Sequence, residues 1–439
     1  MNNYFDLVMV PLQILIVFFT IYYFVISLFG ILPRKKEKKI LTPKTTFAIL
    51  VAAHNEERVV GQLVQNLKML RYPDNMYDIY VIADNCSDHT AQVAREAGAL
   101  VYERTNENPM EQGKGFALAW MFKRLFALEK QYDAVCIFDA DNLVHLDFLK
   151  EMNNRYCKGE RLIQGYLDSK NPNDTWVSGV FSLNFWIVNH VWHLAKYTIG
   201  LSSVFGGTGM AISTDILKKY GWRATCLTED MEFTMQSLLE GVPTTWCHDA
   251  IVYDEKVETF KASWNQRKRW AQGHFDVAER YIPKLLKEGI RRRDIVILDG
   301  VIDLVQPYFL LISTVFLIAS TIYQFVPFYT NILYALLPYT AWQVIGVGQY
   351  VIPAIILIKI HAAPKSWFYC LFYPIFVYSW IPITFLGFLH RHEHAWSHTL
   401  HTRNISFNDV LVPESAEVGP KQIVFPKEKR TKILEKKSL

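Results

Sequence analysis

The sequence contains few cysteines, and their positions follow no pattern. None of the six forms a CxxC pair, and their spacing shows no regular framework. A zinc site would need cysteines at short, repeated spacing, and a disulfide-stabilised secreted domain would need an ordered set that could pair. We therefore expect neither structural zinc nor disulfide bonds, and reduced thiols in contact with the cytosol.

A large excess of charge is also missing. The formal net charge is +4 and the pI is near 8.5. The basic residues gather at the ends of apolar segments, whereas nucleic-acid-binding domains usually carry a far more basic face. Nucleic acid is therefore not an expected partner.

Charged residues are absent from two long apolar stretches, 7–32 and 304–358. The first is long enough to cross a hydrocarbon core of roughly 30 Å, and the second is long enough for two spans with an uncharged turn between them. A signal peptide is the alternative for 7–32, but this stretch is too long, has no basic n-region and is followed by RKKEKK. A transporter or channel would carry ionisable groups inside its spans, so their absence disfavours that class.

The basic run at 34–39 predicts that the chain after it lies in the cytoplasm and that the N-terminus lies outside. A fourth apolar segment, 366–389, contains two prolines and precedes a basic tail. Alternation of spans places this tail outside, whereas the positive-inside rule places it in the cytoplasm. We favour a cytoplasmic tail, with the fourth segment re-entrant or a neighbouring segment at the interface. The predicted parts are an N-terminal span (1–33), a cytoplasmic domain (34–255), amphipathic interface helices (256–303), C-terminal membrane segments (304–390) and a cytoplasmic basic tail (391–439).

Between residues 45 and 255 the pattern changes to short β-rich runs that alternate with helical stretches. This alternation predicts an α/β layer with a largely parallel sheet. The expected strands are 45–53, 78–84, 99–103 and 133–140, and the expected helices are 57–70, 89–97 and 115–128.

Polar side chains follow three of these strands at their carboxyl ends, where ligands of such sheets bind. Glu56 follows the first strand, Asp84 ends the second, and Asp139 and Asp141 end the last, downstream of a turn that contains Lys114. A single aspartate such as Asp84 is more often a turn or helix-cap residue. The pair in FDADN is different, because alternate carboxylates point the same way and repel unless a cation lies between them. Such a pair favours Mg²⁺ or Mn²⁺ shared with a diphosphate-bearing substrate.

Two further stretches carry candidate functional residues. Glu229 and Asp230 are neighbours at an expected helix start, where only one would face the pocket; the alternative is that both are acids favoured by the helix dipole. In the stretch 263–273, SWNQRKRWAQG, helical spacing brings Gln266, Arg269 and Trp270 to one face. Arg267 and Lys268 would then face away, toward lipid headgroups.

Seven short motifs occur in a known order: VAAHNEE, VIADNCSD, GKGFALAW, FDADN, FGGTGMAI, LTED and QRKRW. Over roughly residues 45–275 the chain resembles the membrane-integrated family-2 glycosyltransferases, the group that contains the cellulose, chitin, hyaluronan and poly-N-acetylglucosamine synthases. The resemblance implies an α/β fold in which a cytoplasmic, nucleotide-sugar-binding glycosyltransferase-A domain is inserted between transmembrane helices. It also implies a multi-pass protein of the plasma membrane.

The resemblance implies a role for each motif residue. The nucleotide diphosphate would be bound by Glu56, Asp84 (at the uridine), Lys114, Asp139, Gln266 and Arg269. Asp139 and Asp141 would hold Mg²⁺ or Mn²⁺, with Asp141 as the more direct ligand, and Asp230 would be the general base. The acceptor would lie against Gly207, Thr208, Glu229 and Trp270.

These roles suit an inverting transfer. One carboxylate deprotonates the attacking hydroxyl, and a divalent ion and a guanidinium stabilise the leaving diphosphate. We expect an enzyme that extends a β-linked polysaccharide from a UDP-sugar and feeds it into the membrane; the alternative is transfer of a single sugar to a lipid-linked acceptor. The motifs ADNCSD and FGGTGMA depart from those of many synthases, which leaves the sugar and repeated transfer open. So few membrane spans in one chain would not enclose a wide channel for a polysaccharide. A homo-oligomer or an accessory export subunit is therefore the expected partner. The intact motif set disfavours an inactive nucleotide-sugar-binding protein.

Overall fold

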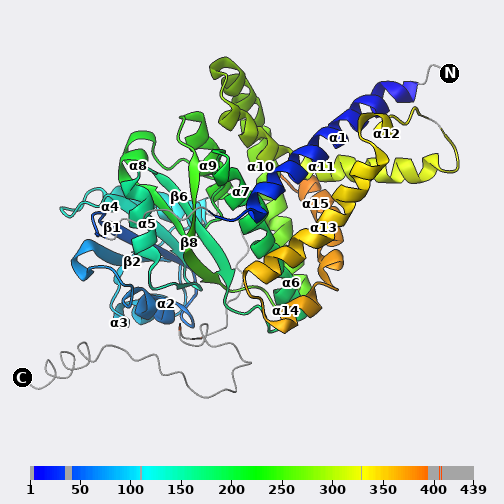
Figure 1. Ribbon diagram of the computed structural model, residues 1–439. Helices are drawn as coiled ribbons and strands as arrows, with labels where there is room; N and C mark the ends of the chain where they lie inside the picture. The colour runs from blue at the N-terminus through cyan, green and yellow to red at the C-terminus, as the bar shows by residue number, and fades with distance from the viewer. Residues whose placement is uncertain are drawn as a thin grey trace, which may run out of the picture.

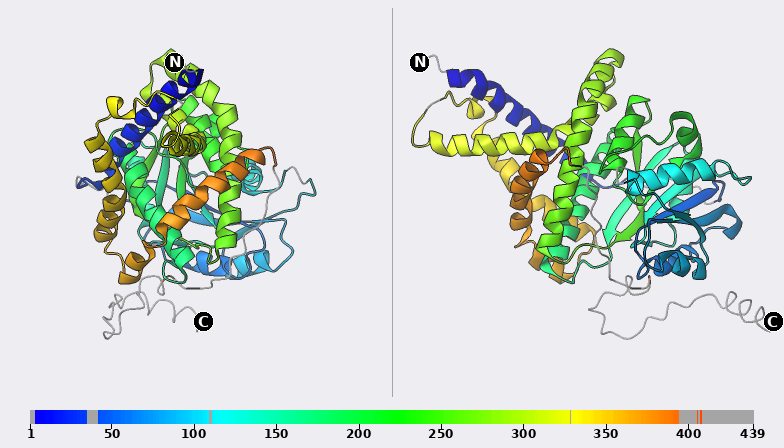
Figure 2. Two further views of the ribbon diagram at one scale, coloured as in Figure 1. Left: turned by 90° about the vertical axis from the view of Figure 1, so that its right-hand side faces the viewer. Right: turned by 180° about the vertical axis from the view of Figure 1, so that it is seen from behind.

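The computed structural model describes residues 4–34, 42–108, 111–327, 329–393, 405 and 407. It consists of an α/β domain and a group of apolar helices that extends from one side of it (Figure 1). The view from behind shows the same arrangement, with the N-terminal end of α1 (Tyr4–Ile31) far from the sheet (Figure 2, right). Most of the predicted tail lies outside the described residues.

The domain contains one sheet of eight strands in the order β3-β2-β1-β4-β7-β6-β8-β5. Strands β1, β2, β3 and β4 pair in parallel, β7 runs antiparallel to both β4 and β6, and β8 pairs in parallel with β6 and antiparallel with β5. The strands are β1 (Phe47–Ala53), β2 (Tyr77–Asp84), β3 (Leu100–Arg104), β4 (Ala134–Asp139), β5 (Leu143–Val144), β6 (Leu162–Ser169), β7 (Met210–Ser213) and β8 (Thr244–Asp254).

The central strands are apolar because helices cover both of their faces. Along β1, Phe47, Ile49 and Val51 pack in a core with α2, whereas Ala48 and Leu50 pack on the other face with α4. The helices of the domain are α2 (Val60–Leu67), α3 (Thr90–Glu96), α4 (Lys114–Leu125), α5 (Phe148–Cys157), α8 (Thr214–Tyr220) and α9 (Glu229–Leu239), with a 3-10 turn η1 (Asp74–Met76).

The four predicted strands and three predicted helices are all present, with ends shifted by a few residues at most. The sheet is less parallel than predicted, because β7 inserts antiparallel between β4 and β6. Parallel pairing holds for the first four strands, whose positions the sequence predicts. Their carboxyl ends therefore meet at one edge, as expected.

Two helical segments join the sheet to the apolar helices. The first is α6 (Trp176–Val188), which continues through the π-helix η3 (Asn189–Leu194) into α7 (Ala195–Thr198). The second is the long helix α10 (Phe260–Arg292), whose first turn is capped by the Thr259 side chain accepting from the Ala262 backbone N–H at 3.2 Å. Helix α10 carries the QRKRW sequence and lies between the sheet and the apolar helices.

Among the described residues, three helices are long and apolar enough to cross a membrane: α1, α11 (Ile295–Tyr323) and α13 (Tyr339–Lys359). They fall on the two predicted apolar stretches, but α11 begins at Ile295 and so includes Asp299 and Asp303. The charge-free stretch from 304 begins directly after these two aspartates. The remaining helices are the short α12 (Leu333–Leu336) and α14 (Pro364–Tyr369), and α15 (Tyr373–Leu389).

A buried charge cluster fastens the α/β domain to α11 and α1. The ammonium of Lys196 on α7 lies 2.6 Å from Asp299 and 2.7 Å from Asp303, and Lys196 is fully buried. Asp299 also accepts a hydrogen bond from the Tyr22 hydroxyl of α1. The backbone of Gly30 lies so close to η3 that a Cβ there would be 2.1 Å from the His190 carbonyl oxygen.

Candidate active site

Several of the predicted site residues lie around the ammonium of Lys114, at the start of α4. Its Nζ donates to the Asp139 carboxylate at the end of β4 and to the Gly207 carbonyl oxygen, the latter at 2.6 Å. Burial alone would lower the pKa of Lys114, but the charges of Asp139, Glu229 and Asp230 outweigh it and raise the pKa. Residues from distant parts of the sequence thus form one charged centre at the carboxyl edge of the sheet.

Glu229 and Asp230 both belong to this centre. They are the first two residues of α9, and the charges of both act on Lys114. The Glu229 side chain lies against Gly115 of α4, where a Cβ would be 3.1 Å from the Glu229 Cβ atom. Burial raises the pKa of Glu229 to about 7 and that of Asp230 to about 6. A carboxylate with a raised pKa is a better proton acceptor near neutral pH.

The loop before β7 brings Gly207 directly against Asp230. Gly207 has φ +82, and a Cβ on it would lie 3.3 Å from the Asp230 Oδ2 atom. Glycine adopts this backbone conformation without strain, and its lack of a side chain leaves room for the Asp230 carboxylate. The adjacent residue, Thr208, is buried and donates from its hydroxyl to the Asn142 side chain.

We expect a Gly207→Ala variant to lose about 1–2 kcal/mol of stability from the positive φ, and to lose turnover because the methyl group crowds Asp230. Gly200 is a matched control, since it has φ +79 but nothing within 4 Å of the place that a Cβ would occupy. Gly200→Ala should therefore lower the melting temperature to a similar extent with no change in kcat. Equal kcat losses in the two variants would contradict a role for the Gly207–Asp230 contact.

Asp141 is buried and is oriented by its neighbours. Its carboxylate accepts from the Asn142 Nδ2 at 3.3 Å and from the Glu255 backbone N–H at 3.3 Å. The Asn142 Oδ1 accepts in turn from the Asp139 backbone N–H at 3.1 Å. One carboxamide thus links both members of the DAD sequence to Thr208. Asn142 was not predicted as a site residue. Its position in FDADN, directly after Asp141, could have indicated it.

A second cluster lies at the end of β2. The Asp84 Oδ1 accepts from Arg104 Nη1 at 2.6 Å, and both side chains are buried. Burial raises the pKa of Asp84, while Arg104 opposes the rise. Arg104 was not predicted as a site residue. The parallel pairing of β2 with β3 could have indicated it, because this pairing puts the ends of the two strands side by side. Glu56 is buried nearby, where its backbone N–H donates to the Thr90 hydroxyl at 2.7 Å.

Helix α10 presents Arg269 and Trp270 to this region. Burial lowers the pKa of Arg269, and the charges of Glu229 and Asp139 in the charged centre oppose the change. Trp270 packs edge-on against the rings of Phe181 and Phe185 on α6, with centroids 5.9 and 6.4 Å apart. Gln266 is half-buried on the preceding turn. Arg269 and Trp270 are partly buried as well.

Arg267 does not face lipid headgroups, contrary to the sequence-based expectation. It is fully buried between α10 and α15, where Nη1 donates to the Ser379 hydroxyl at 2.8 Å. The expectation treated Arg267 and Lys268 alike, as exposed residues. It failed for Arg267 because α15 covers the side of α10 on which this residue lies. Lys268 is partly exposed.

Comparison with known proteins assigns the family. Residues 43–273 match the family described as "Glycosyltransferase like family 2", which is more than half of the chain. The chain belongs to this family. The resemblance drawn from the motifs is thereby confirmed.

Several members of the wider group are similar to this family-2 chain. A probable glycosyltransferase YdaM of Bacillus subtilis is 27% identical over 273 residues, which cover 60% of this chain and 63% of that protein. A beta-monoglucosyldiacylglycerol synthase of Trichormus variabilis is 28% identical over 272 residues (60% and 56%). A poly-beta-1,6-N-acetyl-D-glucosamine synthase of Staphylococcus epidermidis is 23% identical over 270 residues (60% and 64%). The match spans less than two thirds of each relative.

A solved structure supports the fold. The mannosyltransferase PcManGT from Pyrobaculum calidifontis, in complex with GDP-Man and Mn2+, superposes with a TM-score of 0.56 at 14% identity. The superposition covers 87% of this chain and 99% of that one. The predicted class, an α/β glycosyltransferase-A domain combined with apolar helices, is confirmed.

Proposed function

We propose that the protein transfers a sugar from a UDP-sugar, with inversion, to a hydroxyl group of a membrane lipid. The observation that carries the proposal is the charged centre itself: the charges of Asp230, a carboxylate with a raised pKa, and Lys114 act on each other, and the charges of Glu229 and Asp139 in the same centre act on Arg269. Proton acceptance and stabilisation of a leaving diphosphate are the two requirements of this reaction, and groups suited to both stand within one site.

In this proposal Asp230 accepts the proton of the acceptor hydroxyl as its oxygen attacks the anomeric carbon. The bond to the diphosphate breaks on the opposite face, and Lys114 and Arg269 bind the diphosphate oxygens that gain charge. A guanidinium can do so through two parallel hydrogen bonds. Fixed cations in a partly buried site stabilise such charge without reorganising during the reaction. Asp84, held by Arg104, is proposed to accept from the uracil base.

Asp139 and Asp141 fit a Mg²⁺ or Mn²⁺ ion. Among the described residues no group of three His, Cys, Asp or Glu side chains could hold a metal alone. Two carboxylates that are two residues apart suit an ion whose coordination shell is completed by oxygen atoms of the substrate phosphates. Once bound, such an ion would neutralise the diphosphate charge. Lys114, which contacts Asp139 here, would then bind the phosphate oxygens.

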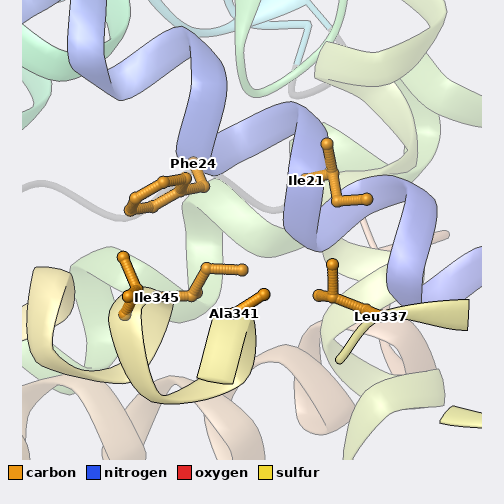
Figure 3. Close-up of a pocket in the computed structure, with 6 residues that line it drawn as sticks. Ile21, Phe24, Leu337, Ala341 and Ile345 are labelled. Atoms are coloured by element: carbon orange, nitrogen blue, oxygen red, sulfur yellow. The ribbon is translucent and has the colours of Figure 1, made fainter. Parts of the chain in front are cut away.

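Two observations favour a lipid acceptor. The space between α1 and α13 is about 360 Å³ and is lined by apolar side chains, so it can take a lipid chain (Figure 3). Its lining residues are Ile21, Phe24, Leu337, Ala341, Val344 and Ile345. The same two helices are joined at the end of α13, where the Lys359 ammonium donates to the Ile31 carbonyl oxygen of α1 at 2.7 Å.

The second observation concerns the surroundings of Trp270. The apolar cluster that contains Trp270 continues into α14 and α15, and both helices expose large apolar side chains such as Phe368 and Tyr378. A lipid with its chains in the membrane can therefore present its headgroup at the Trp270 side of the site. The similarity to a glucosyldiacylglycerol synthase supports this choice. In this proposal the α/β domain faces the cytoplasm and the helices lie in the plasma membrane.

Extension of a β-linked polysaccharide is the second candidate, favoured by the similarity to a poly-N-acetylglucosamine synthase. It needs a path for the glycan through the membrane. The three candidate spans would supply such a path only with additional chains of a homo-oligomer or an export subunit.

The donor can be tested by measuring nucleotide release. Purified protein in lipid nanodiscs with Mn²⁺ would be given a panel of UDP-sugars and, in parallel, GDP-mannose, with and without diacylglycerol. We expect release of UDP from one UDP-sugar, stimulated by the lipid and abolished by EDTA. Release of GDP alone would overturn the assignment of the donor nucleotide.

The pH dependence of kcat/KM should report Asp230 in the free enzyme. Asp230 must be deprotonated to act, so activity should be full above its pKa of about 6 and fall as the pH drops through that value. Burial and the charge of Asp230 raise the pKa of Glu229 to about 7, so Glu229 is still protonated where Asp230 titrates, and Glu229→Gln should leave the acid limb in place. An acid limb that moves by a full pH unit in this variant would contradict this order of titration.

A further inference from the structure

Arg267 is the residue of α10 that is least explained by the proposed reaction. It is fully buried on the side of the helix away from Arg269. Its Nη1 donates to the Phe376 carbonyl oxygen at 3.1 Å and to the Ser379 hydroxyl at 2.8 Å, both on α15, and its Nε donates to the Ser263 carbonyl oxygen at 3.3 Å. Among the described residues no carboxylate pairs with it.

The guanidinium instead lies among aromatic rings, with its carbon 4.2 Å from the centroid of Phe376 and 5.2 Å from that of Trp380. Burial lowers the pKa of Arg267 to about 10, so it stays charged at neutral pH. A buried charge without an opposite charge costs free energy that neutral partners offset only in part. Arg267 is therefore a poor stabiliser of the fold, and its directional contacts point to another role.

Those contacts determine where α15 lies along α10. The ring of Phe376 packs edge-on against Phe181, with centroids 5.3 Å apart, and Phe181 packs against Trp270. A shift of α15 would therefore move the ring that supports Trp270. Farther along the same interface, Gln272 donates to the His390 carbonyl oxygen at 2.9 Å, so α10 and α15 meet over several turns.

We propose that Arg267 is a positioning residue for the acceptor: it fixes α15 on α10 and thereby holds Trp270, through Phe376 and Phe181, at the acceptor side of the site. The inference rests on the proposed function, because it takes Trp270 to contact the acceptor. Arg267 itself touches neither substrate. In some proteins, buried ionic groups fix one packing arrangement of the helices although they lower the stability of the fold.

The test is Arg267→Met, which fills the space without the charge. We expect an unchanged or raised melting temperature, an unchanged KM for the donor, and a KM for the lipid acceptor raised by roughly tenfold, the effect of losing one well-placed aromatic contact. Arg267→Lys keeps the charge and a donor for Ser379, so it should recover part of the loss. Lys268→Met is the matched control on the adjacent position and should change none of these values.

Hydrogen–deuterium exchange gives a readout that does not depend on activity. Amides of α15 should exchange faster in Arg267→Met than in the unaltered protein or in Lys268→Met, while those of α4 stay unchanged. Unchanged exchange in α15, or equal rises of both KM values with a fall in melting temperature, would overturn the inference. Failure of the unaltered protein to glycosylate any lipid would instead overturn the proposed function, and the exchange result would still decide the role of Arg267.

Discussion

Asp230→Asn is expected to lose nearly all sugar transfer while it keeps nucleotide binding. Asparagine has almost the same shape, but it cannot accept the proton of the acceptor hydroxyl. The loss of a general base typically lowers turnover by about 10²–10⁴-fold. The hydrogen bond from the Met231 backbone N–H to the Asp230 side chain at 2.8 Å needs only an oxygen acceptor, which asparagine also supplies, so the site should keep its shape.

This result would be measured as UDP release under saturating donor and acceptor, together with UDP affinity by calorimetry. Asp74→Asn is a control, since Asp74 is exposed on η1, and it should leave both values unchanged. Near-normal turnover by Asp230→Asn would exclude Asp230 as the base. A parallel loss of UDP affinity would instead indicate a role in donor binding.

Lys196→Met should have the largest effect on stability. Lys196 is the cation that compensates Asp299 and Asp303 at the junction of α7 with α11, and it is fully buried. Removing one partner of a buried ionic cluster leaves uncompensated charge and costs about 3–5 kcal/mol. We expect the variant to melt at a much lower temperature in detergent or to fail to accumulate in the membrane.

A triple variant, Lys196→Met with Asp299→Asn and Asp303→Asn, should recover much of the lost stability because no buried charge remains in the cluster. Lys150→Met is the surface control: Lys150 pairs with Asp147 at 2.8 Å, but its side chain is 43% exposed, and such pairs contribute about 0–1 kcal/mol. Equal melting temperatures for Lys196→Met and Lys150→Met would contradict the proposed role of the cluster.

The first half of the sheet could be predicted because its strands are buried on both faces. The sequences of β1, β2 and β4 are therefore continuous apolar runs between turns, and pairing in parallel brought their polar ends together. Strand β7 has four residues and β5 has two, too few for a pattern to show. Strand β8 carries charged and polar residues along its length, because its position near the edge of the sheet and its bulged pairing with β6 leave some of them partly exposed.

The contacts that the sequence did not reveal share one cause: partners that lie far away in the sequence. The pairing of Asp299 and Asp303 could not be predicted because their cation, Lys196, lies 107 positions before Asp303. Arg267 and Lys268 are indistinguishable by composition, and only the docking of α15 separates a buried cation from an exposed one. Arg104 became visible as the partner of Asp84 only when β3 was placed beside β2.

Product analysis tests the proposed transfer to a lipid most directly. Protein in nanodiscs that contain diacylglycerol would be incubated with the UDP-sugar that supports UDP release and with Mn²⁺, and the extracted products would be analysed by mass spectrometry. We predict a lipid whose mass has increased by one sugar, formed by the unaltered protein and not by Asp230→Asn. A long water-soluble polymer, with no glycosylated lipid, would contradict this prediction.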